Sequence, residues 1–224
     1  MSFRMLVMSD IHGNVEAVEI ARTYREDVDV AVLSGDIASY GGGRGEEIIK
    51  GITQHIGNTV FVIGNCDYPS EFSAEWLQPF NIHGRHKVIL GYYFLGLGGS
   101  PPSPFHMPFE MPDKELEAIL KRAYESLPFE VNSEKLILVS HSPPKKTKLD
   151  KIRLGLHVGS EAVRRFIEIA QPILCICGHI HEARGIDKLG RTVLVNPGPA
   201  MKGYYALVEI SNGKVEVELK RWAK

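Results

Sequence analysis

Side chains that can bind a metal ion or move a proton occur in five short clusters along this 224-residue sequence. In each cluster an Asp, Asn or His stands close to a small residue, Gly or Ser. The clusters contain Asp10 and His12, then Asp36, then Asn65 and Asp67, then His141, and finally His179 and His181. Carboxylates, a carboxamide and imidazoles are the groups that a hydrolytic metal site uses.

The number and type of these groups indicate the chemistry that they would serve. Oxygen and imidazole ligands without an obligatory thiolate suit Mn, Fe, Zn or Ni. Two carboxylates, one carboxamide and four imidazoles are too many for one catalytic zinc, which uses three protein ligands and a water. They match two ions that share a bridging carboxylate. Such a pair, about 3.5–4 Å apart, clamps the attacking and departing oxygens of an in-line displacement, typically at phosphorus.

Each cluster follows a short apolar run that is rich in Val, Ile and Leu. The runs are residues 5–8, 28–33, 59–63, 136–139 and 173–177. Nearly continuous hydrophobicity over this length is typical of a strand that is covered on both faces. In open α/β sheets, ligands bind just outside the carboxyl ends of the strands. We therefore expect the five clusters to converge on one crevice.

Longer segments with apolar residues at helical spacing separate these strands. They are residues 15–25, 44–55, 114–127 and 160–170. Strands that alternate with such helices predict βαβ units and a largely parallel sheet. Residues 86–97 predict a hairpin, and residues 192–195, 204–210 and 215–220 predict consecutive strands, the last two joined by an Asn-Gly turn. The pattern indicates an α/β fold with two packed sheets, helices outside them, and one domain over residues 1–224.

The composition is that of a soluble globular protein. Lys and Arg number 26 against 27 Asp and Glu, so the formal net charge is −1, and this gives no broad attraction for nucleic acid or an anionic membrane. Three cysteines are too few, and odd in number, for a disulfide framework, so we expect a reducing compartment, the cytoplasm. Residues 88–109 form the longest uncharged stretch, but its glycines and prolines exclude a membrane helix.

Taken in order, these motifs resemble those of the calcineurin-like metallophosphoesterase family, and within it the small prokaryotic Icc-related phosphoesterases. The family pattern is Asp-x-His, Gly-Asp, Gly-Asn-His-Asp/Glu, a further His, and Gly-His-x-His. All five blocks occur between residues 10 and 181. The resemblance implies a four-layer α/β/β/α sandwich of two mixed β-sheets flanked by helices, and a metal-dependent phosphoric ester hydrolase.

The resemblance also assigns ligands to two divalent metal ions, with Mn the ion expected to support activity. The first ion would be held by Asp10, His12, Asp36 and His181. The second would be held by Asn65, His141 and His179, with Asp36 as the bridge. A hydroxide that bridges both ions would be the nucleophile, its pKa lowered by them. The residues expected to act in catalysis are Asp36, Asn65, Asp67 and His141.

One block departs from the family pattern. Cys66 stands where the family has a His that contacts phosphate and helps the leaving group depart. A buried thiol is a poor acid, and a thiolate would repel phosphate. We therefore expect weak monoesterase activity and hydrolysis of small, nucleotide-like phosphodiesters with good leaving groups. Cys66, Asn14 and His157 are candidates for binding the substrate, His157 because it precedes a helix start, where phosphate can bind.

Other interpretations of single residues stay open. Asp10 or Asn14, taken alone, would serve equally well as a cap of the following helix. The spacing of Cys175, Cys177, His179 and His181 permits a zinc site rich in thiolates. The apolar surroundings of both cysteines favour a position in the core instead. His83 has no ligand partner at useful spacing and is expected at the surface.

Alternative functions also remain. The same site would suit a phosphomonoesterase or a nuclease, and the fold would suit a non-catalytic scaffold, as in the retromer member of this family. Near-neutral charge and the lack of a basic stripe disfavour a long nucleic acid as partner. Specificity is expected to reside in the loops at residues 100–112 and 143–159. No pattern in the sequence indicates an oligomeric state.

Overall fold

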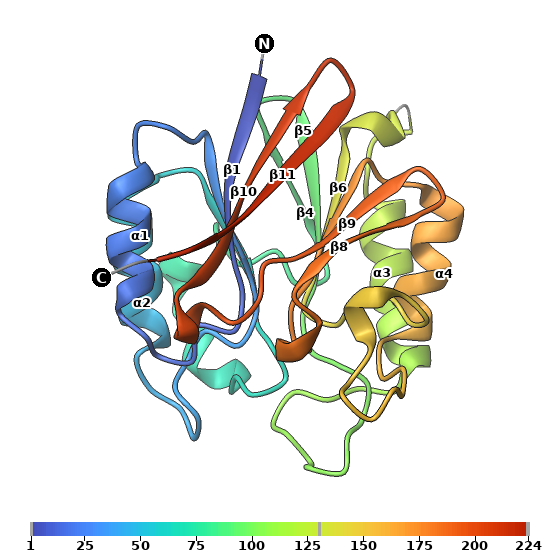
Figure 1. Cartoon of the computed structure of the whole chain (residues 1–224), viewed down its shortest axis with the longest axis horizontal. Coiled ribbons are helices and arrows are strands. Elements are labelled where there is room, and N and C mark those ends of the chain that lie inside the picture. The colour runs from blue at the N-terminus through green and yellow to red at the C-terminus, as the bar shows by residue number, and fades with distance from the viewer. Residues whose placement is uncertain (1, 130, 223–224) are drawn as a thin grey trace.

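Two β-sheets packed face to face form the centre of the molecule (Figure 1). The computed structural model describes residues 2–129 and 131–222. The first sheet has the order β11-β10-β1-β2-β3 and consists of β1 (Ser2–Met8), β2 (Val30–Ser34), β3 (Thr59–Val62), β10 (Tyr204–Ser211) and β11 (Lys214–Arg221). The second has the order β4-β5-β6-β7-β9-β8 and consists of β4 (His86–Ile89), β5 (Tyr92–Leu97), β6 (Leu136–Ser140), β7 (Leu174–Ile176), β8 (Gly185–Leu189) and β9 (Thr192–Asn196).

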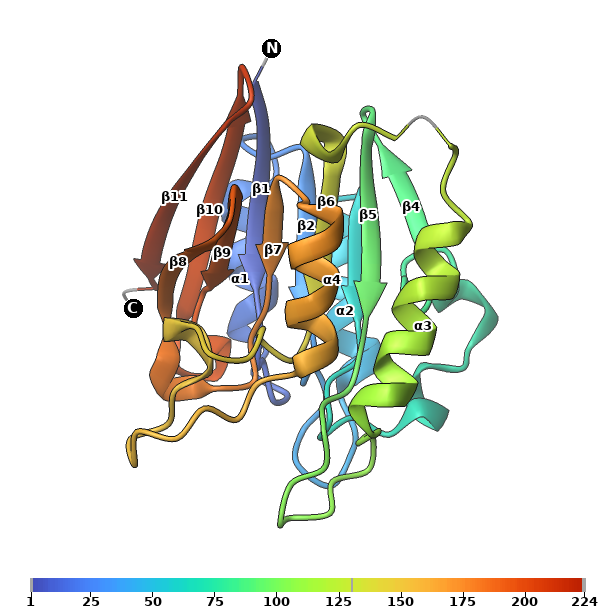
Figure 2. The ribbon, with the colours of Figure 1, turned by 90° about the vertical axis from the view of Figure 1, so that its right-hand side faces the viewer.

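Helices cover the outer face of each sheet. The first sheet packs against α1 (Glu16–Tyr24) and α2 (Gly45–His55). The second packs against α3 (Asp113–Glu125) and α4 (Glu161–Ala170), which stand in front of it in Figure 2. The predicted four-layer α/β/β/α sandwich of two mixed sheets is confirmed.

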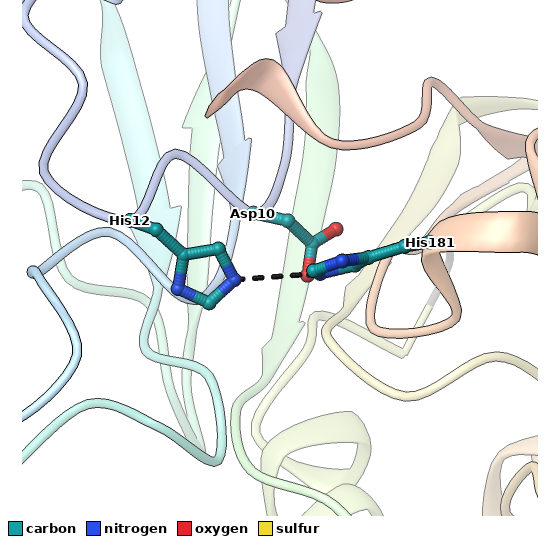
Figure 3. Close-up of side chains that lie close together, drawn as sticks. All are labelled: Asp10, His12 and His181. Carbon is teal, nitrogen blue, oxygen red and sulfur yellow. Dashed lines mark hydrogen bonds and ion pairs between the residues drawn. The ribbon is translucent and has the colours of Figure 1, made fainter. Parts of the chain in front are cut away.

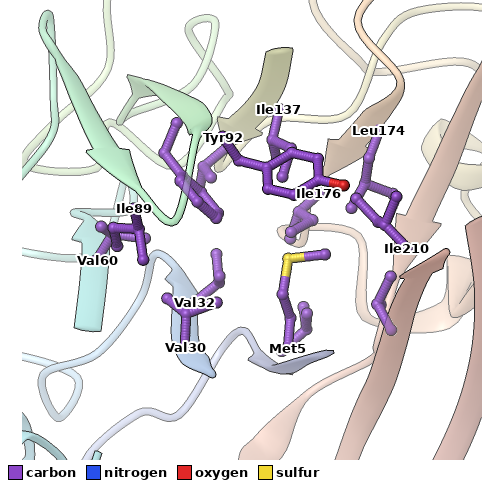
Figure 4. Close-up of a cluster of buried hydrophobic side chains, with 14 of the residues drawn as sticks. Met5, Val30, Val32, Val60, Ile89, Tyr92, Ile137, Leu174, Ile176 and Ile210 are labelled. Atoms are coloured by element: carbon purple, nitrogen blue, oxygen red, sulfur yellow. The ribbon is translucent and has the colours of Figure 1, made fainter. Parts of the chain in front are cut away.

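The central strands are apolar at successive positions because their two faces pack against different layers. In β2, Val30 and Val32 belong to the core between the sheets, whereas Ala31 and Leu33 belong to the core beneath α1 and α2. Figure 4 shows the inner core, with Val32 and Met5 of the first sheet on one side and residues of the second sheet on the other. Each such side chain contributes about 1.5–3 kcal/mol through burial.

The parallel strands of both sheets end at the same edge of the molecule. β1, β2 and β3 run parallel to one another, as do β5, β6, β7 and β9. Backbone hydrogen bonds join the two sets of strand ends: Gly99 N donates to Ile63 O at 2.9 Å, and Ala200 N donates to Ser9 O at 2.8 Å. Segments that follow strands of different sheets are therefore held side by side.

Two cysteines whose role the sequence left open lie in the core. Cys175 and Cys177 have fully buried side chains in the cluster that joins the second sheet to α3 and α4. This position agrees with their interpretation as small apolar residues. Among the helices of residues 2–129 and 131–222, none has both the length and the apolar character that crossing a membrane requires.

His83 is largely covered, in contrast to the surface position expected from the sequence. Its Nδ1 accepts a hydrogen bond from Gly98 N at 2.8 Å, just after β5, and the edge of its ring meets the Phe109 ring. Burial, with a smaller contribution from the charge of Arg85, lowers the pKa of His83 to about 4.

The pKa of His83 predicts that the protein loses stability in mild acid. Because the folded state binds the His83 proton less readily than the unfolded chain, the free energy of unfolding should fall between about pH 6.5 and pH 4. This group accounts for at most about 1.4 kcal/mol per pH unit. A His83→Gln variant keeps an acceptor for Gly98 N–H but does not titrate, so its urea midpoint should change less over this range. His106→Gln, at an exposed histidine, is the control, and an unchanged pH dependence in His83→Gln would contradict the assignment.

Candidate metal centre

Polar residues that follow β1, β2, β3, β6 and β7 form one continuous cluster at the carboxyl edge of the sheets. The structure brings together all seven side chains predicted as metal ligands, which are Asp10, His12, Asp36, Asn65, His141, His179 and His181. Each of them contacts at least one other member. Residues more than a hundred positions apart therefore share one site.

The backbone turns sharply where it carries these side chains. Asp10, His12, Asp36 and His179 have positive φ angles of 53°, 46°, 51° and 67°. A side chain in this left-handed region costs roughly 1–2 kcal/mol, and such residues concentrate at functional sites. Hydrogen bonds hold the turns in place: Asp10 N donates to Gly35 O at 3.0 Å, and His12 N donates to Asp36 O at 2.9 Å. Strained backbone conformations thus orient these four side chains beyond the ends of the strands.

The first half of the cluster consists of Asp10, His12 and His181 (Figure 3). His181 Nε2 lies 3.3 Å from Asp10 Oδ1 and 3.3 Å from His12 Nε2. Burial alone would raise the pKa of Asp10, but the hydrogen bond with His181 and the charges of His141 and His181 lower it to about 2. The hydrogen bond with Asp10 in turn raises the pKa of His181. Asp10 is therefore an anion at neutral pH, as a metal ligand must be.

The second half of the cluster is organised around His141. Its Nδ1 lies 2.8 Å from Ser34 O, and because a carbonyl only accepts, Nδ1 carries the proton. The lone pair of Nε2 then faces two oxygens, Asn65 Oδ1 at 2.8 Å and Asp36 Oδ1 at 3.5 Å. Three electron-pair donors that face one another are an arrangement that a cation satisfies. The residues present thus fit a metal site.

His179 completes this half. Its ring lies 5.1 Å from the His141 ring, and its backbone N–H donates to the Asp10 carboxylate at 3.1 Å. Burial and the charge of His141 lower the pKa of His179 to about 4. The imidazole is therefore neutral near pH 7, the protonation state that binds metals.

Asp36 links the two halves. Its Oδ2 lies 3.6 Å from His12 Nε2, and its Oδ1 lies 3.5 Å from His141 Nε2. Oδ1 also accepts a hydrogen bond from the backbone N–H of Cys66 at 2.9 Å, which orients the carboxylate. One carboxylate oxygen of Asp36 thus faces each half of the cluster.

Asp67 stabilises the loops that carry the cluster. Its carboxylate is fully buried and accepts hydrogen bonds from the backbone N–H groups of Ile37 (3.1 Å), Ala38 (2.8 Å) and Gly64 (2.8 Å). These bonds tie the loop after Asp36 to the loop after β3. Burial and the nearby charge of Asp36 raise the pKa of Asp67 to about 7. Asp67, which the sequence predicts as a catalytic residue, thus holds the loop that carries Asp36.

Two of the predicted substrate-binding residues, Asn14 and His157, form hydrogen bonds with neighbouring loops. Asn14 Oδ1 accepts a hydrogen bond from the backbone N–H of Glu16, the first residue of α1, and Asn14 Nδ2 reaches the carbonyl of Met201 at 3.3 Å. His157 Nδ1 lies 2.6 Å from Oδ1 of the buried Asp150. These contacts hold both side chains against loops, and among the described residues no hydrogen bond joins either of them to the seven clustered side chains.

The third predicted substrate-binding residue, Cys66, lies inside the cluster. Its thiol belongs to a group with His12 and Asp36 whose ligand atoms all lie within 4.8 Å of one another. Burial, then the charge of Asp36, raises the pKa of the Cys66 thiol well above its usual range. Cys66 is therefore a neutral thiol in this arrangement.

Sequence reasoning missed Tyr40. Its ring stacks on the imidazole of His12, with centroids 4.1 Å apart and planes 14° apart, and its hydroxyl lies 3.1 Å from His12 Nε2. Burial, then the neighbouring Cys66 and the charge of Asp36, raises the pKa of Tyr40 to about 12. The sequence feature that could have indicated Tyr40 is its position four residues after Asp36, in the loop that follows β2.

The fold and the site together define a class of protein: an α/β sandwich that carries an Asp/His cluster, suited to metal ions, at the carboxyl ends of its strands. The sequence model of the calcineurin-like phosphoesterase family matches residues 3–183. The chain belongs to this family.

Known proteins similar to this chain cover nearly all of it. An uncharacterized protein from Methanocaldococcus jannaschii is 34% identical over 208 residues, which are 90% of each chain. The crystal structure of TT1561 from Thermus thermophilus matches with a TM-score of 0.72 at 22% identity, over 97% of this chain and 99% of that one. GAP50, described as the anchor in the inner membrane complex of Plasmodium, matches with a TM-score of 0.59 at 12% identity, over 98% and 84%. At such identities the two structures show the shared fold alone.

Proposed function

We propose that this chain is a dinuclear metal-dependent phosphodiesterase that hydrolyses a small, nucleotide-like phosphodiester. The observation that carries the proposal is the position of Asp36, whose two carboxylate oxygens face different halves of one seven-residue cluster at 3.5 and 3.6 Å. An interaction scaffold would not need to maintain buried, strained polar groups at one edge. Membership in the calcineurin-like phosphoesterase family supports the same reaction class.

The cluster divides into two ligand sets that share Asp36. One set is Asp10, His12, Asp36 and His181. The other is Asp36, Asn65, His141 and His179. Two divalent cations, with Mn preferred among Mn, Fe, Zn and Ni, would supply the acidification of water and the neutralisation of charge that phosphoester hydrolysis needs.

Hydrogen bonds from neighbouring groups of the chain orient these ligands. Ser34 O fixes the His141 tautomer so that Nε2 presents its lone pair, as second-sphere partners do at metal sites. The Cys66 backbone N–H holds one Asp36 oxygen, and Asp67 holds the loop that carries Asp36. Ligands that are positioned in advance need little rearrangement when substrate binds.

The neutral Cys66 thiol defines which esters we expect this site to hydrolyse. A thiol whose pKa lies far above neutrality donates a proton poorly, so a leaving alkoxide would depart without protonation by Cys66. Esters whose leaving groups need no proton are then favoured.

We expect the manganese-loaded protein to hydrolyse bis(p-nitrophenyl) phosphate with a kcat/KM at least about tenfold above that for p-nitrophenyl phosphate, a difference of about 1.4 kcal/mol in transition-state stabilisation. The measurement is p-nitrophenolate release by each ester at pH 7.5. Chelation with EDTA should abolish the rate, and added Mn²⁺ should restore it. A faster rate on the monoester would refute the diester preference. No turnover of either ester by fully loaded protein would refute the function itself.

The remaining expectations are also proposals. We propose a small phosphate ester rather than a nucleic acid polymer as the partner, because the formal net charge is only −1. We propose the cytoplasm as the location, because all three cysteines are unpaired thiols.

A further inference from the structure

Tyr40 covers the metal-binding atom of His12 without being one of the seven clustered side chains. Its phenol oxygen lies 3.1 Å from His12 Nε2, and its ring lies parallel to the imidazole. With 58% of Tyr40 exposed, the face of the ring opposite His12 is open to solvent. The side chain thus stands between the cluster and the bulk solvent.

The loop that carries Tyr40 is anchored at its base. Ser39 N donates to Gly43 O at 2.9 Å, and the Gly43 N–H donates to the Glu71 carboxylate at 2.8 Å. Gly41, Gly42 and Gly43 have φ angles of 82°, 100° and 90°, so the chain reverses through conformations that favour glycine. This tight turn fixes the backbone position of Tyr40, and the Tyr40 side chain extends from it over His12.

His12 Nε2 cannot serve both Tyr40 and a cation. The nitrogen faces Asp36 Oδ2 at 3.6 Å and His181 Nε2 at 3.3 Å, which makes it the atom turned toward the ligand set. An imidazole nitrogen has one lone pair, so a nitrogen that binds a metal no longer accepts a hydrogen bond from a phenol. The Tyr40 O–H, fixed at this point, then requires another acceptor.

Among the described residues, the neighbours that act on Tyr40 are Cys66, Asp36 and Asp10, and the Asp10 carboxylate already faces His181 Nε2 and accepts from the His179 N–H. The carboxylate of Asp36 is committed to the ligand set and to the Cys66 N–H. The thiol of Cys66 is a weak acceptor. Because Tyr40 is 58% exposed, water accepts from this hydroxyl in the free protein. When a phosphate ester binds, an anionic phosphoryl oxygen is the strongest acceptor that it brings to this position.

We propose that Tyr40 is a substrate-binding residue whose phenolic O–H donates a hydrogen bond to a non-bridging oxygen of the phosphoryl group, an assignment that rests on the proposed function. The exposed face of the ring borders the place where the organic part of the ester must lie. Tyr40 thereby supplies an uncharged donor near Cys66, whose thiol donates only weakly.

Removal of the single hydroxyl tests this contact. In Tyr40→Phe the ring still stacks on His12, but the donor is lost. Inorganic phosphate, titrated calorimetrically into manganese-loaded protein, should bind roughly tenfold or more weakly to Tyr40→Phe, the range expected for a hydrogen bond to a charged group. Manganese stoichiometry, measured from the electron paramagnetic resonance of free Mn²⁺, should not change. With bis(p-nitrophenyl) phosphate, KM should rise more than kcat falls.

Tyr124→Phe is the matched control, because Tyr124 lies on α3 with its ring packed against Phe166 and is likewise partly exposed. It should bind phosphate and manganese as the wild type does. Wild-type phosphate affinity in Tyr40→Phe would overturn the proposal. Loss of manganese from Tyr40→Phe would overturn it too, because Tyr40 would then support the metal and not the substrate. Absence of ester turnover by wild-type protein that still binds phosphate through Tyr40 would instead count against the proposed function.

Discussion

Replacing Asp36 by Asn is expected to abolish both metal binding and ester hydrolysis. The substitution keeps the size of the side chain but removes the charge and turns one of the two oxygens, which face His12 and His141, into an amide nitrogen without a lone pair. We therefore expect kcat/KM for bis(p-nitrophenyl) phosphate to fall by about a thousandfold or more. Manganese retained after dialysis, measured by plasma mass spectrometry, should fall in parallel.

Asp27→Asn provides the control for this experiment, because Asp27 is exposed in the turn after α1 and undergoes the same chemical change. It should keep the wild-type rate and metal content. Circular dichroism of Asp36→Asn should show a folded protein, so that the loss is assigned to the site. A folded Asp36→Asn variant with full activity, or with a full complement of manganese, would rule out Asp36 as the bridge between the two halves of the cluster.

The convergence of the site could be predicted because two simple patterns coincide in the sequence. Strand β2 is apolar at four successive positions, residues 30–33, because Val32 faces one layer and Leu33 the other, and this marks it as a central strand. A polar residue directly after such a strand, Asp36 here, must lie at the carboxyl edge. The family resemblance then predicted the second sheet's place in the sandwich.

Features that depend on tertiary contacts were not predictable in the same way. β8 (Gly185–Leu189) was missed because it is an outer strand whose residues are half-buried or exposed and include Asp187 and Lys188, so it lacks an apolar run. The covered position of His83 depends on Gly98, which follows β5 and contacts His83 across the fold. Tyr40 reaches His12 only because a glycine turn folds back over the cluster, and periodicity carries no information about such a contact.

The roles of the supporting residues were visible only in the hydrogen bonds. Asp67 stands in the same block as Asn65, and its type alone suggests acid–base chemistry. Three backbone N–H groups occupy its carboxylate, so its contribution is to hold the loops together. His157 is similarly bound to Asp150. Sequence motifs identify which residues gather at the strand ends, whereas the contacts show which of them are held by backbone groups of the loops.

Gly64 is a position where a single added methyl group should displace Asp36 directly. A Cβ at Gly64 would lie 2.0 Å from Asp36 Oδ1 and 2.3 Å from the Asp36 backbone nitrogen. Relief by a backbone shift is resisted, because the carboxylate of Asp67 holds Gly64 N and Ala38 N together. Overpacking of this kind costs about 1–3 kcal/mol. In Gly64→Ala the Asp36 carboxylate must therefore move away from the position between His12 and His141.

The expected result for Gly64→Ala is a loss of about a hundredfold in kcat/KM, as displacement of a catalytic group by about 1 Å causes, with a melting temperature several degrees lower. Ester hydrolysis and thermal unfolding measure the two effects. Gly57→Ala is the matched control, since Gly57 precedes the same strand, β3, and an added Cβ there meets nothing within 4 Å. Gly57→Ala should leave the rate unchanged. Wild-type activity in Gly64→Ala would show that the placement of Asp36 against the β3 loop does not control the reaction, because the clash falls directly on that carboxylate.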